Sequence, residues 1–375
     1  MNPKRHRIVL QAKKMRVVVV SLLLQPCWVT PSLRCLLPQI EGSIPHSRFS
    51  SGRRYRLNRV TADMETQNKL MEKAKKPVNF RLCRVSGSMT EIMEIQAENP
   101  TFHVLFIPGN PGVVSFYKEF LESLYEFLDG NASIVAIGHI SHTSKDWESG
   151  RLFSFQEQIN HKIDFIRQEL ESVKVPIVLV GHSIGSYICL EILRKFSKKM
   201  VYCIGLYPFL TLNQQSTTQS LIGKLAASSA LSATASFLIA SLSLLPVSAA
   251  RLLVSKSVGA SWSDTAVQAT CTHLRQYHTM RNVLFMAKSE FTELAAEPDW
   301  DFMRENQSKL AFLFGIDDHW GPLQLFEEIS KQAPGTSLSI EREGHTHGFS
   351  CTVAGSEWVA QHVATLIKNR FSQLQ

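Results

Sequence analysis

Apolar and polar positions predict strands that alternate with helices along most of the chain after residue 77. Short runs of apolar residues predict strands at 102–107, 133–138, 177–180, 310–314 and 337–340. Apolar residues at helical spacing predict helices over 115–128, 156–170, 187–196 and 358–368. Two earlier strands, 78–82 and 92–95, are expected to join near Gly87. This alternation is typical of an α/β fold, with a mainly parallel sheet covered by helices on both faces.

Positive charge is concentrated in a leader at the start of the chain. Residues 1–63 carry twelve Lys or Arg against Glu41 and Asp63, so the remainder of the chain has a net charge of −2, although the whole chain has +8. The body of the protein therefore lacks the basic surface that nucleic-acid binding requires. We expect residues 1–75 to be a disordered leader and residues 76–375 to form the folded domain.

Three interpretations of the leader remain open. Its apolar run, residues 17–24, is shorter than the roughly 20 residues that span a bilayer. The basic, acid-poor composition partly matches an organelle-targeting segment and partly matches a secretory signal. Met64 begins a plausible polar N-terminus, so the preceding residues can also be an upstream extension of a gene model.

The seven cysteines include no C-x-x-C pair and do not cluster with histidines. This pattern favours reduced thiols in a reducing compartment over a disulfide framework or a metal site. We therefore expect a folded part that faces the cytosol, with no metal and no cofactor. The sequence does not indicate an oligomeric state.

A Gly-x-Ser-x-Gly pentapeptide, residues 181–185, follows the branched strand 177–180 and opens a helix. The pentapeptide alone is common, but a strand–turn–helix context is what a nucleophilic serine requires. The two glycines permit a tight turn that presents Ser183 Oγ, and the helix directs its N-terminal N–H groups at a developing oxyanion. Ser183 is therefore the predicted nucleophile of an α/β-hydrolase fold, and an incidental turn is the alternative.

Two backbone N–H groups are candidates for an oxyanion hole. One belongs to Ile184, directly after the nucleophile, and the other should come from the loop after an earlier strand. Pro-Gly-Asn-Pro-Gly at 108–112 occupies that place, and Pro111 has no N–H, which leaves Asn110. The alternative is a Gly/Pro turn without a catalytic part.

The remaining members of a catalytic triad should follow in the order acid, then histidine. Asp318 follows the strand 310–314 and is preferred over Asp317 as the acid. His347 follows the strand 337–340 and is preferred over His345 as the general base. The acid would hold the imidazole tautomer while the histidine takes the serine proton. His319 is expected at the surface or at the rim of a pocket.

These motifs together resemble the lipid droplet-associated hydrolase family. The matching segments are Phe-Ile-Pro-Gly-Asn-Pro-Gly at 106–112, Gly-His-Ser-Ile-Gly-Ser-Tyr at 181–187, 315–322 and His-Gly-Phe at 347–349. The family's Asp-Pro-Trp-Cys-Pro is Asp-His-Trp-Gly-Pro here, beginning at Asp318. Gln158 and His161 also match, and either line a groove or belong to a helix that packs on the sheet.

The resemblance implies a cytosolic serine hydrolase that sits on lipid droplets and cleaves carboxylic esters, such as neutral lipid or sterol esters, through an acyl-enzyme. The same scaffold also carries acyltransferases. A third hypothesis is a binding or structural protein of the droplet surface whose hydrolase site is weak or vestigial. The implied partners are a lipid ester and the droplet monolayer, or the endoplasmic reticulum membrane, and no nucleic acid.

An insertion at about 212–309 lies where such folds carry a lid. Within it, residues 225–250 contain no charged side chain, and Lys224 and Arg251 flank them. Pro246 and the many Ser and Ala residues make this segment a poor single membrane span. We expect a helical hairpin that dips into a phospholipid monolayer, or alternatively a lid buried against the catalytic domain.

Overall fold

The computed structural model describes residues 76–258 and 261–374. The predicted leader, residues 1–75, lies outside the described residues. From Val78 onwards the described residues belong to one compact unit. The five cysteines in this part of the chain are buried and free.

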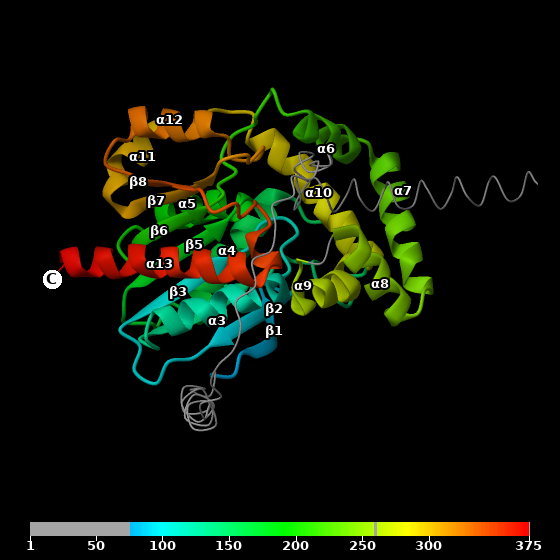
Figure 1. The fold of residues 1–375 in the computed structure, drawn as a ribbon, viewed down its shortest axis with the longest axis horizontal. Helices are drawn as coiled ribbons and strands as arrows, with labels where there is room; N and C mark the ends of the chain where they lie inside the picture. Colours follow the sequence, from blue (N-terminus) through cyan, green and yellow to red (C-terminus); the bar gives the residue numbers. More distant parts are fainter. Residues whose placement is uncertain (1–75, 259–260, 375) are drawn as a thin grey trace, which may run out of the picture. The chain divides into compact units, whose positions relative to one another are not determined.

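The centre of the fold is an eight-stranded sheet with the strand order β1-β2-β4-β3-β5-β6-β7-β8 (Figure 1). The strands are β1 (Asn79–Val85), β2 (Ser88–Ile95), β3 (Phe102–Ile107), β4 (Ala132–Ile137), β5 (Ile177–His182), β6 (Met200–Leu206), β7 (Leu310–Gly315) and β8 (Ser337–Glu341). The six strands from β4 to β8 are parallel, and β2 runs antiparallel to both of its neighbours. The predicted α/β fold with a mainly parallel sheet is confirmed.

Helices cover both faces of the sheet (Figure 1). On one face lie α3 (Lys118–Phe127) and α13 (Val353–Leu374), and on the other lie α4 (Phe155–Glu169), α5 (Ile184–Lys195) and α12 (Leu323–Gln332). In β3, Val104 and Phe106 pack into the first layer, whereas Leu105 and Ile107 pack into the second. Strands buried on both faces read as continuous apolar runs, which is why the sequence indicated β3, β4, β5 and β7 clearly.

Some elements differ from the sequence predictions. The predicted helix 115–128 is divided into a 3-10 turn, η1 (Val114–Tyr117), and α3. Phe80 and Leu82, which give β1 its apolar alternation, are exposed, whereas Cys83 and Val85 lie in the same apolar layer as α4. As an edge strand covered on one side, β1 buries only one set of its side chains. The prediction also missed β6 and α12.

All the regular elements described in the insertion between β6 and β7 are helices. Its elements are α6 (Thr217–Ala227), α7 (Ser229–Ala240), η2 (Ser241–Leu244), α8 (Val247–Val258), α9 (Asp264–Ala269), η3 (Thr270–Leu274), α10 (Tyr277–Glu293), α11 (Trp300–Asn306) and η4 (Gln307–Lys309). Ser216, Ser228 and Ser263 cap α6, α7 and α9 by accepting backbone N–H bonds. Among the described helices, only α6 together with the segment Ser229–Leu244 has the length and hydropathy of a membrane span, and this pair is bent by 98°.

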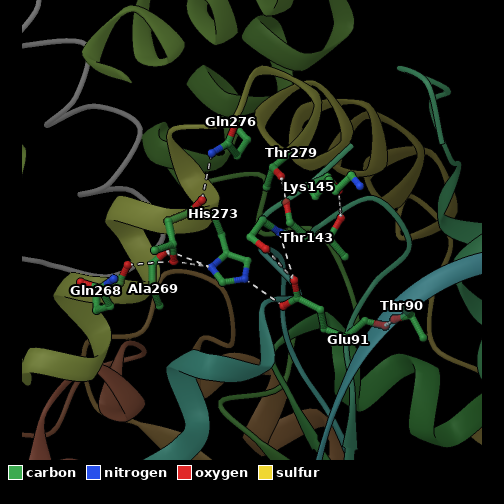
Figure 2. Close-up of polar contacts among 12 residues, drawn as sticks. Thr90, Glu91, Thr143, Lys145, Gln268, Ala269, His273, Gln276 and Thr279 are labelled. Atoms are coloured by element: carbon green, nitrogen blue, oxygen red, sulfur yellow. Dashed lines mark hydrogen bonds and ion pairs between the residues drawn. The ribbon is translucent and has the colours of Figure 1, made fainter. Parts of the chain in front are cut away.

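Hydrogen bonds anchor the insertion to β2 and to the loop after β4. His273 of η3 places Nε2 2.8 Å from Glu91 Oε2 on β2 (Figure 2). Thr279 Oγ1 and His278 Nε2, both at the start of α10, donate to the carbonyl oxygen of Thr143, each at 2.9 Å. The start of α10 is therefore fixed to the loop after β4.

Candidate active site

Ser183 lies in a strained turn between β5 and α5. Its backbone has φ 55° and ψ −125°, a conformation that non-glycine residues rarely adopt. Two close approaches explain the flanking glycines: a Cβ at Gly181 would lie 2.4 Å from the Gly185 carbonyl oxygen, and a Cβ at Gly185 would lie 2.3 Å from that of Ile107. Ser183 N–H donates to Leu206 O at 2.9 Å, which ties the turn to β6. The turn has the geometry of a nucleophile elbow.

The loop after β3 packs directly against this elbow. A Cβ at Gly109 would lie 3.0 Å from the Ser183 Cβ. Ile184 is the first residue of α5, so the helix itself leaves the Ile184 N–H without a partner. Within the described residues, the backbone N–H groups of Asn110 and Ile184 donate to no acceptor. Both groups therefore remain available for an oxyanion beside Ser183.

The structure brings Asp318 and His347 together. His347 Nδ1 lies 2.8 Å from Asp318 Oδ2, and Asp318 Oδ1 accepts the Trp320 N–H at 2.9 Å. The Asp318 side chain is only 1% exposed, and His347 is buried as well. By contrast, Asp317 is exposed and His345 packs against Trp358. Of the two carboxylates and two histidines that the sequence offered, Asp318 and His347 are the ones that pair.

His347 also lies against the elbow. The His182 ring, next to Ser183 in sequence, has its centroid 4.8 Å from that of His347. Among the described residues no hydrogen bond joins Ser183 Oγ to His347. Catalytic hydrogen bonds are commonly long in sites without substrate. The arrangement thus holds an acid–histidine pair beside a strained serine.

A buried carboxyl group from the insertion binds the Asn110 side chain. Asn110 Nδ2 donates to Glu290 Oε1 at 2.9 Å and to Val283 O at 3.0 Å, both on α10. Burial raises the pKa of Glu290 to about 8, so the carboxyl group is mostly protonated at neutral pH. A neutral Glu290 avoids placing a negative charge next to a candidate oxyanion hole. Sequence reasoning missed Glu290 because 180 residues separate it from Asn110.

Aromatic side chains surround the other side of His347. The Trp320 ring centroid lies 6.2 Å from that of His347, and Phe209 lies 4.9 Å from Trp320. Phe291 of α10 completes this cluster at 6.0 Å from Phe209. The environment beside the acid–histidine pair is therefore apolar, which suits a hydrocarbon group rather than a charged one.

Other polar residues of the motifs have structural contacts. Gln158 of α4 is fully buried and exchanges two hydrogen bonds with the backbone of Ile140, at 2.9 and 3.1 Å, which braces the loop after β4. His161 is buried on the same helix, so these two residues pack rather than line an open groove. His319 is half-buried, and its carbonyl accepts a bond from Gln219. Within the described part of the chain, no group of three or more His, Cys, Asp or Glu could hold a metal ion.

Solved structures with the same fold define the class. The haloalkane dehalogenase DbeA from Bradyrhizobium elkani USDA94 matches with a TM-score of 0.57 at 12% identity, covering 79% of this chain and 100% of its own. The epoxide hydrolase VrEH1 from Vigna radiata matches with a TM-score of 0.56 at 15% identity, over 79% and 100%. The thioesterase domain from the curacin biosynthetic pathway matches with 0.54 at 15%, over 78% and 99%. The fold is that of the α/β-hydrolases.

Sequence comparison identifies the family. The profile of the family described as "Lipid-droplet associated hydrolase" matches residues 100–350, and the chain belongs to this family. The lipid droplet-associated hydrolase of Gallus gallus is 27% identical over 277 residues, 70% of this chain and 84% of the relative. The corresponding protein of Dictyostelium discoideum is 25% identical, over 78% of this chain and 99% of its own, and that of Homo sapiens is 23% identical, over 80% and 97%. The family name indicates a hydrolase associated with lipid droplets.

Proposed function

We propose that this protein is a serine esterase that hydrolyses carboxylic esters of neutral lipids or sterols through Ser183, His347 and Asp318. One observation carries the proposal: the strained Ser183 elbow lies against the hydrogen-bonded pair of His347 and Asp318. A buried acid–histidine pair has the geometry that activates a serine hydroxyl.

The proposed reaction proceeds in two steps. Ser183 Oγ attacks the ester carbonyl carbon while His347 Nε2 takes its proton, and the backbone N–H groups of Asn110 and Ile184 bind the resulting oxyanion. His347 then donates that proton to the leaving alcohol, which breaks the ester bond and leaves an acyl-enzyme. A water molecule attacks the acyl carbonyl while His347 takes its proton, and His347 then returns that proton to Ser183 Oγ as the acid product leaves. Asp318 holds the imidazole and stabilises its charged form throughout.

The surroundings of the site support an apolar ester as substrate. The aromatic cluster formed by Phe209, Phe291 and Trp320 lies beside His347. The neutral state of Glu290 also leaves no carboxylate charge at the Asn110 loop at neutral pH. Both features favour an uncharged lipid ester over a polar or anionic substrate.

We expect the purified protein to hydrolyse esters and to leave amides of matching structure intact. The assay would compare a short aryl ester, a triacylglycerol emulsion and a cholesteryl ester emulsion with an aryl amide, and acid release would be measured for each. The Ser183→Ala variant serves as the blank. If correctly folded protein shows no Ser183-dependent acid release from any ester, the esterase proposal is wrong, and a binding protein of the droplet surface becomes the better interpretation.

Under the same proposal, the insertion contacts the phospholipid monolayer of the droplet from the cytosol, and the endoplasmic reticulum membrane offers similar chemistry. Exposed apolar side chains on the insertion support this contact: Leu221, Leu231, Phe237, Leu244, Leu245, Leu252 and Leu253. Leu244 is 88% exposed and Phe237 is 66% exposed, although large apolar side chains are normally buried. The opposite sides of α6 and α7 bury Ile222, Ala226, Ala235 and Ile239. The insertion thus combines a packed side with an outward apolar surface.

Replacing Leu231, Phe237, Leu244 and Leu252 by serine should release the protein from droplets. Each apolar side chain contributes roughly 1.5–3 kcal/mol when fully buried, so even partial insertion of four should change partitioning by about 100-fold or more. Flotation with artificial triolein droplets and with bilayer vesicles would measure this, and the bilayer arm separates droplet from reticulum binding. The matched control carries serine at Phe80, Leu82, Phe127 and Val353, which are exposed outside the insertion. Equal flotation of both variants would contradict monolayer contact through this surface.

A further inference from the structure

A chain of hydrogen bonds runs behind the nucleophile and joins two loops of the site. Gly109 N–H donates to Tyr117 Oη at 3.1 Å, and Tyr117 Oη lies 2.7 Å from His182 Nδ1. His182 Nε2 lies 3.0 Å from the carbonyl oxygen of His347. The chain therefore connects the residue before Asn110 to the backbone of His347, through the residue before Ser183.

The chemistry of these groups determines where each proton lies. A carbonyl oxygen can only accept, so His182 Nε2 carries the hydrogen that binds His347 O. Burial holds the pKa of His182 well below its usual value, so the ring is neutral and its Nδ1 is an acceptor. The Tyr117 hydroxyl must then donate to His182 Nδ1, while its oxygen accepts from Gly109 N–H. A single direction of donation satisfies all four residues.

Burial makes this chain a rigid support. Tyr117 is fully buried and His182 is 1% exposed. The His182 ring also packs edge-on against Phe349, with centroids 5.2 Å apart, and edge-on against Tyr117 at 5.7 Å. Hydrogen bonds are electrostatically stronger away from water, and breaking one leaves an unpaired polar group in the interior. Movement of either loop would therefore be costly.

The geometry points to Tyr117 and His182 as positioning residues that hold the oxyanion loop and the His347 backbone in register around Ser183. This inference rests on the proposed function, because the Ser183 reaction requires the Asn110 N–H and the His347 ring to be placed at the same time. Neither residue contacts the ester in the proposed reaction. Both act indirectly, through Gly109 and through the backbone of His347. A displacement of about 1 Å in such groups can lower a rate by about 10².

Tyr117→Phe is the first test, because it removes one hydroxyl and preserves the ring packing. We expect kcat on a short aryl ester to fall about 10- to 100-fold, with KM changed by less than about twofold, because alignment rather than substrate binding is lost. Tyr202→Phe is the matched control, because Tyr202 is a buried tyrosine of β6 that takes no part in this chain of hydrogen bonds. It should lose stability similarly without the fall in kcat.

A second pair of variants isolates the His347 end. His182→Gln retains an N–H donor near the position of Nε2, whereas His182→Leu has a similar size and no donor. We expect the kcat of His182→Gln to be at least about tenfold higher than that of His182→Leu, since a tenfold change corresponds to one hydrogen bond of ordinary net strength. Because both variants fill the space of the ring, rescue by the donor-bearing variant distinguishes positioning from simple filling of space.

A spectroscopic measurement makes the inference independent of turnover. The His347 Nδ1 proton facing Asp318 should give a low-field proton resonance, which Tyr117→Phe should shift or broaden and Tyr202→Phe should leave in place. If Tyr117→Phe keeps kcat within twofold of wild type, or Tyr202→Phe lowers it equally, the inference is overturned. If wild type hydrolyses no ester, the proposed function fails instead, and an unchanged resonance in Tyr117→Phe then overturns the inference separately.

Discussion

Ser183→Ala is expected to lower kcat for ester hydrolysis by a factor of about 10⁵ to 10⁶, the size seen when the nucleophile of a serine triad is removed. The substitution deletes only Oγ, because serine and alanine share the Cβ that already lies in the strained turn at φ 55°. The fold should therefore persist, and the melting temperature should stay close to that of wild type. Steady-state hydrolysis and labelling by a fluorophosphonate probe would both measure the loss.

Ser186→Ala is the matched control for that experiment. Ser186 lies three residues further on, in the first turn of α5, and its hydroxyl donates to Gly181 O at 3.0 Å, away from any reacting group. We expect its activity to stay within a few-fold of wild type, with a modest loss of stability from the lost hydrogen bond. Fluorophosphonate labelling that survives in Ser183→Ala, or disappears equally in Ser186→Ala, would rule out Ser183 as the nucleophile.

Asp318→Asn is expected to lower kcat by about 10⁴, with little effect on stability. The asparagine can still accept the Trp320 N–H through its oxygen, so the loop after β7 should remain in place. Its amide nitrogen, however, would donate to His347 Nδ1 and favour the tautomer that carries its hydrogen on Nε2. That tautomer cannot accept the Ser183 proton, so the rate falls although the geometry is preserved.

Asp317→Asn provides an internal control one residue away. Asp317 is exposed, so its loss should leave kcat within about threefold of wild type. Both variants would be compared by kcat, KM and melting temperature on the same ester. A larger loss in Asp317→Asn than in Asp318→Asn would reverse the assignment of the acid, and equal activity of both with wild type would remove the carboxylate from the mechanism.

The elements that sequence patterns predicted well are those whose signals are local. The β5 strand, the 181–185 turn and α5 follow each other within 20 residues, and their hydrophobic pattern and glycines specify the elbow without reference to the rest of the chain. The parallel strands β3, β4, β5 and β7 were equally clear because both of their faces are buried, although β6, which is buried as well, was missed. The edge strand β1 was less clear, because its exposed Phe80 and Leu82 give a misleading hydrophobic signal.

The packing of the insertion could not be predicted from its local sequence pattern. Its lack of charge predicted an apolar element, but the sequence could not separate a hairpin that enters a monolayer from a lid that packs on the domain. The structure shows packing on one side of α6 and α7 and exposed leucine and phenylalanine on the other. Which side of an amphipathic helix finds a partner depends on distant contacts, such as those made by α10, that its own residues do not encode.

The sequence by itself determined the α/β fold, the elbow around Ser183 and the Gly/Pro loop at 108–112, because each depends on neighbouring residues. Only the tertiary structure decided that Asp318 rather than Asp317 meets His347, that Glu290 binds Asn110, and that His182 links Tyr117 to the His347 backbone. These contacts join residues that are 29 to 180 positions apart in the chain. Their hydrogen-bond geometry arises only when the sheet brings its strand ends together.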